Sequence, residues 1–146
     1  MDFDKFLKKY VWDDNKTPYL TPADALTREQ IHYEAGAYAV FLTLLFSAVA
    51  LTLTIGAAAT PRSTGGALYA FSVACAGIVL GFTRHQYAAL YAASAPLATV
   101  LYLLAEGLRP SWGTIDVVFV ALFIGAWIAY SIRVLRMTRR YAALNA

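Results

Sequence analysis

The sequence contains four long stretches without a single charged side chain. They cover residues 35–61, 63–83, 85–105 and 117–132. A helix needs about 20 consecutive apolar residues to cross the hydrocarbon core of a bilayer. The first three stretches reach that length, and residues 112–116 extend the fourth at its start. We therefore predict membrane-spanning helices near residues 38–58, 67–83, 87–105 and 114–134.

The predicted fold class is an all-α integral membrane protein with a bundle of four transmembrane helices. Of the 146 residues, 60% are hydrophobic and 14% are charged, whereas about 25% of the residues in soluble domains are charged. A water-soluble fold of this size would lack the polar surface to cover itself. The net charge of +3 does not indicate nucleic-acid binding, because the positive residues sit at the ends of apolar stretches and form no separate basic face.

Turn-forming residues separate most of the predicted spans. Residues 60–66 and 107–113 contain Gly, Pro and Ser, which favour turns. Only residues 84–86 lie between spans two and three, so a tight reversal is expected there. Pro96 is expected to bend span three, because proline removes a backbone donor and crowds the preceding turn.

Lysine and arginine are unevenly distributed between the two sides of this predicted fold. With a cytoplasmic N-terminus, ten of the twelve lie on the cytoplasmic side, and only Arg62 and Arg109 lie on the other. This asymmetry follows the positive-inside rule. We therefore predict a multi-pass protein of the cell inner membrane with both termini in the cytoplasm. Trp and Tyr residues near the span ends, including Trp127, are expected to anchor at headgroup depth.

The sequence divides into three predicted parts. Residues 1–34 are expected to form a cytoplasmic or interfacial amphipathic arm, residues 35–136 the transmembrane domain, and residues 137–146 a short basic cytoplasmic tail. Residues 3–11 place apolar side chains at helical spacing, which predicts a short helix on the inner leaflet; the same arm is a candidate docking surface for a protein partner. Thr27 and Gln30 have the spacing of a capping box, so a helix is expected to begin near Arg28.

Small residues recur at helical spacing in the predicted spans. In lipid, such residues let helix backbones approach closely and so mark helix-packing faces. We expect each row of small residues to pack against another helix of the same chain, in preference to a helix of another subunit. The predicted packing residues are Ala70, Ala74, Gly77 and Gly81 in span two, and Ala121, Gly125 and Ala129 in span four.

The sequence offers few candidate residues for transport, cofactor binding or catalysis. No Asp, Glu, Lys or Arg lies in the middle of a span, which disfavours a charge-coupled transporter. His32 and His85 both fall on the predicted inner side and form a candidate pair of haem ligands; without haem, no cofactor is expected. No metal site and no catalytic motif were found. Arg84, Arg133 and Arg136 are candidate contacts for lipid headgroups.

The function that fits this pattern best is a small noncatalytic accessory or assembly subunit of a larger inner-membrane protein complex. Its expected partners are membrane lipids and a larger membrane protein, or further copies of the same chain. Two alternatives stay open at this point. One is a small oligomeric transporter or channel for a small solute, with hydroxyl side chains lining a path. The other is a haem-binding membrane redox anchor.

Overall fold

The computed structural model describes residues 21–55, 61–107 and 111–144. Within these ranges the chain is helical and contains no strand. Four helical segments are long and apolar enough to cross a membrane, which indicates a multi-pass membrane protein: Arg28–Ile55, Thr64–Thr83, Gln86–Ala105 and Thr114–Ala143. The helix predicted at residues 3–11 lies outside the described residues.

The first long helix, α2 (Arg28–Ile55), follows a short 3-10 turn, η1 (Ala23–Ala25). The predicted capping box at its start is confirmed. The Thr27 amide donates to Gln30 Oε1 at 2.9 Å, and the Gln30 amide donates to Thr27 Oγ1 at 3.4 Å. Two amides that the helix leaves without an internal acceptor are thereby satisfied. The helix thus begins well before the span predicted at residue 38, and it runs unbroken across residue 34.

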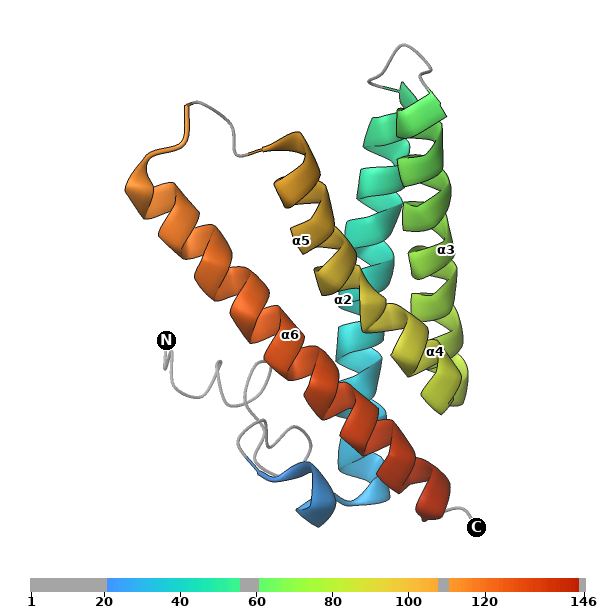
Figure 1. Cartoon of the computed structure of the whole chain (residues 1–146). Coiled ribbons are helices and arrows are strands. Elements are labelled where there is room, and N and C mark those ends of the chain that lie inside the picture. The colour runs from blue at the N-terminus through green and yellow to red at the C-terminus, as the bar shows by residue number, and fades with distance from the viewer. Residues whose placement is uncertain (1–20, 56–60, 108–110, 145–146) are drawn as a thin grey trace, which may run out of the picture.

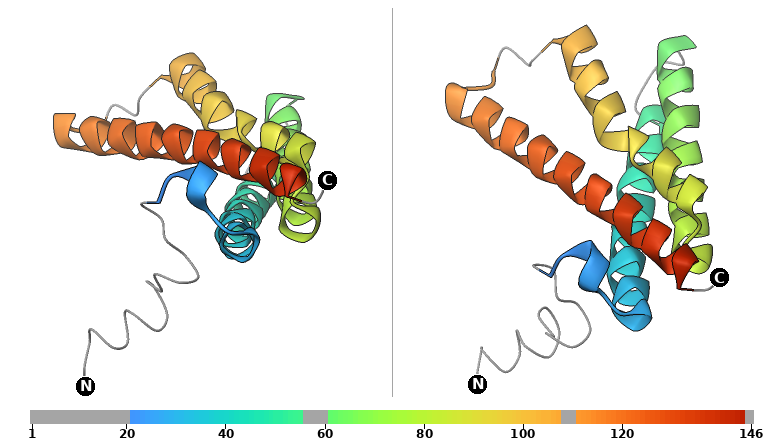
Figure 2. Two further views of the ribbon diagram at one scale, coloured as in Figure 1. Left: turned by 90° about the horizontal axis from the view of Figure 1, so that it is seen from below. Right: turned by 60° about the horizontal axis from the view of Figure 1, so that its bottom comes forward.

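Helix α3 (Pro61–Thr83) runs antiparallel to α2 and stays beside it in every view (Figures 1 and 2). It ends where Arg84 takes a left-handed backbone conformation with φ of 55°. His85 is extended and caps the next helix. The tight reversal predicted at residues 84–86 is therefore present.

The third candidate span is broken into α4 (Gln86–Ala92) and α5 (Ser94–Glu106). The direction of the chain changes between them (Figure 1). Pro96 has no N–H to donate to the carbonyl of Ala92, and its ring crowds that carbonyl. The bend predicted for this span is present, and the interruption lies at Ala93, just before the proline.

Helix α6 (Thr114–Ala143) lies across the axes of α2 and α3 (Figure 2). It contacts α2, α4 and η1. Helix α6 also continues to Ala143, through most of the segment predicted as a tail at residues 137–146. Met137 and Thr138 in that segment are fully buried, so this part of the helix packs against the rest of the chain. At its start, Asp116 Oδ2 accepts the Gly113 amide at 2.9 Å.

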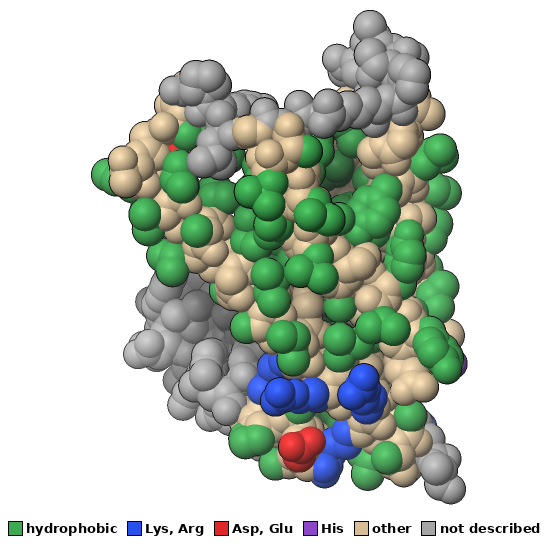
Figure 3. Space-filling model, viewed as in Figure 1, with side chains coloured by type: hydrophobic (Ala, Val, Ile, Leu, Met, Phe, Trp, Pro, Cys, Tyr) green, Lys and Arg blue, Asp and Glu red, His purple; other side chains and the backbone are tan. Residues whose placement is uncertain are grey.

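The described arginine side chains gather at one end of the molecule, which holds the start of α2, the α3–α4 reversal and the last turns of α6 (Figures 1 and 3). We call it the arginine end. The rest of the visible surface is dominated by apolar side chains (Figure 3). The arginines whose side chains the structure describes are Arg28, Arg84, Arg133, Arg136, Arg139 and Arg140.

Candidate functional site

An ion pair joins α2 to α6 at the arginine end. Glu34 is fully buried, and its carboxylate accepts hydrogen bonds from Arg133 Nε at 2.6 Å and Arg133 Nη2 at 3.1 Å. The Tyr130 hydroxyl donates to the same carboxylate at 3.3 Å. Arg133 Nη1 donates to the Thr21 carbonyl at 2.6 Å. Since a buried carboxylate is costly unless it is paired and hydrogen-bonded, this cluster holds α2, α6 and the chain before η1 together.

The sequence placed Glu34 near a span boundary but gave no prediction of this pair. A signal for its burial was available. Glu34 lies at helical spacing with Ile31, Tyr38 and Leu42, and all of them are buried. A carboxylate on the apolar face of a helix indicates a cation supplied by a neighbouring element. The pattern did not identify which of the many arginines that cation is.

Arg84 forms a second polar cluster between α2 and α3. Its side chain is bent back, so that Nη1 donates to the Leu80 carbonyl at 3.0 Å. Nη2 donates to the His32 carbonyl at 2.9 Å and lies 3.3 Å from His32 Nε2. Nε is buried and has no hydrogen-bond partner in the described part of the chain. Arg84 therefore links the end of α3 to the start of α2, and its Nε–H has no partner among the described residues.

The charge of Arg84 is poorly compensated. The residue is only 5% exposed, and among the described residues its polar contacts are carbonyl oxygens and an imidazole, with no carboxylate. Burial lowers the pKa of the guanidinium, and the Tyr141 phenol acts against this shift. An arginine nevertheless keeps its proton in a protein at neutral pH. The result is a buried cation at the arginine end.

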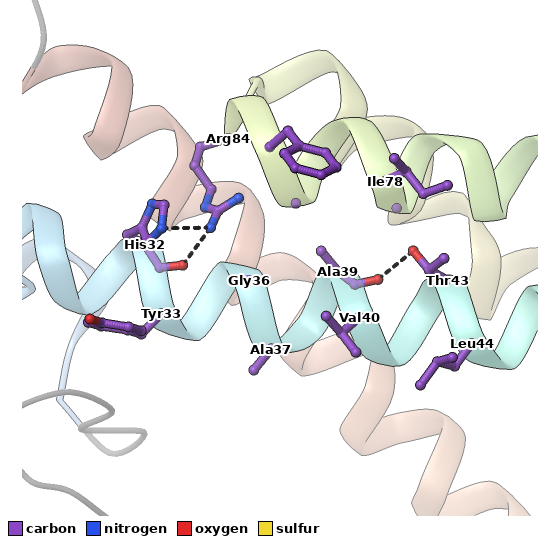
Figure 4. A pocket seen from close by; sticks show the side chains of 13 residues that line it. His32, Tyr33, Gly36, Ala37, Ala39, Val40, Thr43, Leu44, Ile78 and Arg84 are labelled. Atoms are coloured by element: carbon purple, nitrogen blue, oxygen red, sulfur yellow. Dashed lines mark hydrogen bonds between the residues drawn. The ribbon is translucent and has the colours of Figure 1, made fainter.

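An open apolar groove of about 470 Å³ begins at Arg84 and His32 and follows the line where α2 meets α3 (Figure 4). We call it the α2–α3 groove. Val40 and Leu44 of α2 and Ile78 of α3 form part of its lining. Glycine at position 36 leaves room for the cation, because a Cβ there would lie 3.1 Å from Arg84 Nη2.

A second open groove, of about 410 Å³, separates α2 from α6 and is lined by aromatic rings, including those of Phe41, Phe123 and Trp127. The Trp127 indole N–H donates to the Tyr38 hydroxyl at 3.2 Å, and this hydroxyl shares a hydrogen bond of 2.7 Å with Ser131 Oγ. The Trp127 ring therefore packs between α2 and α6, and its predicted headgroup depth stays a prediction. The indole is buried between helices because its polar atom has a partner there.

The small-residue stripes of α3 and α6 have different surroundings. Ala70, Ala74 and Gly77 are buried, and a Cβ at Gly77 would lie 2.6 Å from Thr43 Oγ1 of α2. A Cβ at Gly81 would lie 3.4 Å from the Cβ of Ala39. The α3 stripe thus lies against α2. On α6, by contrast, the stripe residues are all exposed, and no described atom lies within 4 Å of a Cβ built at position 125: Ala121, Gly125 and Ala129.

The histidines and arginines singled out from the sequence have separate roles in local structure. His85 Nδ1 accepts the Tyr87 amide at 3.3 Å at the start of α4, whereas His32 Nε2 faces Arg84. Haem ligation by the two histidines stays a prediction. Of the three arginines predicted to contact headgroups, Arg84 is bound to α2, Arg133 is paired with Glu34, and Arg136 is exposed.

Hydroxyl groups proposed as a polar path are used mainly within the protein. Thr43 and Thr99 donate to carbonyls of their own helices at 2.8 and 2.9 Å. Ser72 bonds the Tyr91 hydroxyl at 2.6 Å, and Ser94 bonds the Tyr69 hydroxyl at 2.8 Å. No group of three or more potential metal ligands occurs among the residues that the structure describes. Comparisons with protein-family models, with curated proteins and with solved structures found no match to this chain.

Proposed function

We propose that this chain is a four-span protein of the cell inner membrane and serves as a noncatalytic accessory or assembly subunit of a larger membrane-protein complex. Both ends of the chain are proposed to lie in the cytoplasm. The four spans are proposed to form a helical bundle whose arginine end faces the cytoplasm. A helix of the larger partner is proposed to pack against α6.

Membrane insertion is supported by the nature of the exposed surface. Large apolar side chains such as Leu44, Phe82 and Phe119 are more than 60% exposed, whereas soluble proteins rarely expose extensive apolar patches. The arginine side chains that the structure describes lie at one end (Figure 3), as the positive-inside rule expects of the cytoplasmic side.

A noncatalytic role is supported by how the ionisable groups at the arginine end are used. Glu34 and Arg133 neutralise each other, and Arg140 Nε donates to the Leu26 carbonyl at 2.9 Å. These contacts hold helices in place. Along the middle of the candidate spans the described chain carries no Asp, Glu, Lys or Arg, where pumps and coupled transporters need such groups.

The observation that carries the proposal is the contrast between the two small-residue stripes. The stripe of α3 lies against α2, so this chain uses small residues for close helix packing. The stripe of α6 has the same spacing but faces outward, along a helix that leans away from α2 and α3 (Figure 1). Small residues give lipid little contact and give a neighbouring helix close approach. A transmembrane helix of another chain is the occupant we propose.

Site-directed crosslinking in native membranes tests this proposal. In a Cys75→Ser background, a photoreactive maleimide probe attached to Gly125→Cys should crosslink one defined chain of different mass. The same probe on Leu68→Cys, an exposed position of α3 (65% exposed), should give no such product. Gly125→Leu should prevent stoichiometric co-purification of the crosslinked chain, because its side chain blocks close helix approach.

Two outcomes would contradict the accessory role. A product with twice the mass of this chain would identify a homo-oligomer. Equal labelling of lipid from Gly125→Cys and Leu68→Cys would show that the outward face of α6 has no protein neighbour.

A further inference from the structure

We propose that the α2–α3 groove binds one anionic phospholipid, with the phosphate at Arg84 and His32 and an acyl chain lying along the groove. This inference rests on membrane insertion, as proposed above, and needs no protein partner for α6. It assigns a specific site where the sequence indicated only a general attraction of arginines to headgroups.

The headgroup end is defined by Arg84. Arg84 is 5% exposed, and among the described residues its guanidinium has no carboxylate contact and its Nε–H has no partner. A buried charge without a countercharge is strongly unfavourable. Phosphate is the anion that a guanidinium recognises best, since its planar set of donors matches the phosphate oxygens. An anion at the groove end of the guanidinium supplies the missing countercharge.

The imidazole of His32 lies beside the guanidinium and adds a second polar group to the same end. His32 is exposed, and its Nε2 lies 3.3 Å from Arg84 Nη2. Glu34 lies two residues from His32 on α2, but its carboxylate is paired with Arg133 and does not compete for Arg84. In Figure 4, His32 and Arg84 point toward one another across the gap between the helices.

The rest of the groove fits a hydrocarbon chain. Along α2 its lining extends from His32 to Leu44, which is about 18 Å at the rise of an α-helix. One leaflet contributes about 15 Å of the hydrocarbon core. The groove is lined mostly by apolar side chains, and Val40 and Ile78 are 60% and 47% exposed. Its length and chemistry therefore match one acyl chain that descends from a headgroup at the arginine end.

An anionic phospholipid is favoured over free phosphate and over a zwitterionic lipid because the site combines a cation at Arg84 with an apolar groove. Inorganic phosphate would leave the apolar groove unused. A zwitterionic lipid would bring its own cation next to Arg84. Only an anionic amphiphile satisfies both the guanidinium and the groove.

The test is lipid binding to the full-length protein purified in a mild detergent. Native mass spectrometry counts bound lipid after addition of 1-palmitoyl-2-oleoyl phosphatidylglycerol or of the matching phosphatidylcholine. We expect one retained phosphatidylglycerol, bound about tenfold more tightly than phosphatidylcholine, because the choline cation of phosphatidylcholine repels the Arg84 guanidinium. Inorganic phosphate should neither shift the unfolding temperature nor displace the lipid.

Matched variants separate the headgroup end from the groove. Arg84→Gly keeps the reversal, because glycine accepts a positive φ, and should reduce phosphatidylglycerol binding to the level of phosphatidylcholine. Arg136→Ala removes an exposed arginine at the same end and should leave the preference intact. Val40→Trp should fill the groove and weaken binding of both lipids, whereas Val49→Trp, on α2 outside the groove, should not.

The proposal is overturned if Arg84→Gly folds and keeps the preference for phosphatidylglycerol. Loss of the preference in Arg136→Ala would mean diffuse charge attraction, and displacement of the lipid by phosphate would mean a simple anion site. If Arg84→Gly does not fold, Val40→Trp decides, because unchanged lipid binding in that variant contradicts the site. Absence of a lipid site would not change the crosslinking result from Gly125→Cys, so the lipid site and the partner helix on α6 are tested independently.

Discussion

At the scale of single residues, the pairing of Glu34 with Arg133 leads to the sharpest prediction. Glu34→Gln removes the buried carboxylate that Arg133 Nε contacts at 2.6 Å, and with it this ion pair between α2 and α6. We expect the free energy of unfolding to fall by about 3 kcal/mol, the cost of breaking a buried ion pair. Reversible unfolding of the purified protein in a denaturing detergent measures this loss.

The double variant of Glu34→Gln and Arg133→Gln is the control. It removes both partners of the ion pair, so it should be less destabilised than the two single losses added together. Strict additivity of the single effects would show that the two side chains are not coupled, since coupling is what a double-mutant cycle measures.

The buried Tyr38 hydroxyl supports a smaller prediction. Tyr38→Phe leaves the Trp127 indole and Ser131 without their shared partner. Hydrogen bonds between membrane helices contribute about 0.6 kcal/mol each on average. Because Tyr38 makes two of them, we expect the free energy of unfolding to fall by about 1 kcal/mol. The same unfolding measurement checks it. Tyr102→Phe removes an exposed hydroxyl and should have no effect; equal losses in both variants would contradict a specific role for Tyr38.

At the scale of helices, two glycines give opposite predictions. Gly77→Ala places a Cβ 2.6 Å from Thr43 Oγ1 and 3.2 Å from the Ala39 carbonyl oxygen. Because that carbonyl belongs to the backbone, α2 and α3 must separate, and we expect the free energy of unfolding to fall by about 1–3 kcal/mol.

The second substitution is Gly125→Ala, whose Cβ meets no described atom within 4 Å. It should raise the free energy of unfolding by about 0.5–1 kcal/mol, because alanine favours the helix more than glycine does. Thermal unfolding compares them, and a shift of the same sign in both would refute the contrast.

Helix positions followed from the sequence because they depend on neighbouring residues. The capping box at Thr27 and Gln30 and the bend near Pro96 are set within a few positions of the chain. The outward rotation of the α6 stripe could not be predicted in this way. The spacing of Ala121 and Gly125 places them on one face, but tertiary contacts decide where that face points.

At the scale of the whole molecule, the position of the arginines predicts the topology. In a Cys75→Ser background, a membrane-impermeant maleimide added outside intact cells should label Ser111→Cys, which lies between α5 and α6. It should not label Arg136→Cys at the arginine end until the membrane is opened. Labelling of both positions from the same side would contradict the single crossing by α6 between them and the cytoplasmic placement of the arginine end.

The candidate site was only partly accessible from the sequence for a similar reason. Arg84 and His32 were each singled out, but for different purposes, and their contact joins residues 52 positions apart. Glu34 and Arg133 are 99 positions apart. Such partners are determined by the packing of α2 against α3 and α6, and one sequence without its fold does not specify that packing.

The oblique course of α6 has a consequence for bilayer thickness. With 30 residues, α6 is about 45 Å long, whereas the hydrocarbon core is about 30 Å thick. A helix that exceeds the core can tilt to keep its apolar length covered, at little energetic cost. The polar contacts of α6 with α2 and with the chain on either side of η1 all lie in its second half, between Trp127 and Arg140, so the first half of α6 is the less tightly held. In the membrane topology proposed above, a thinner or thicker bilayer is expected to change the tilt of α6 relative to α2 and α3.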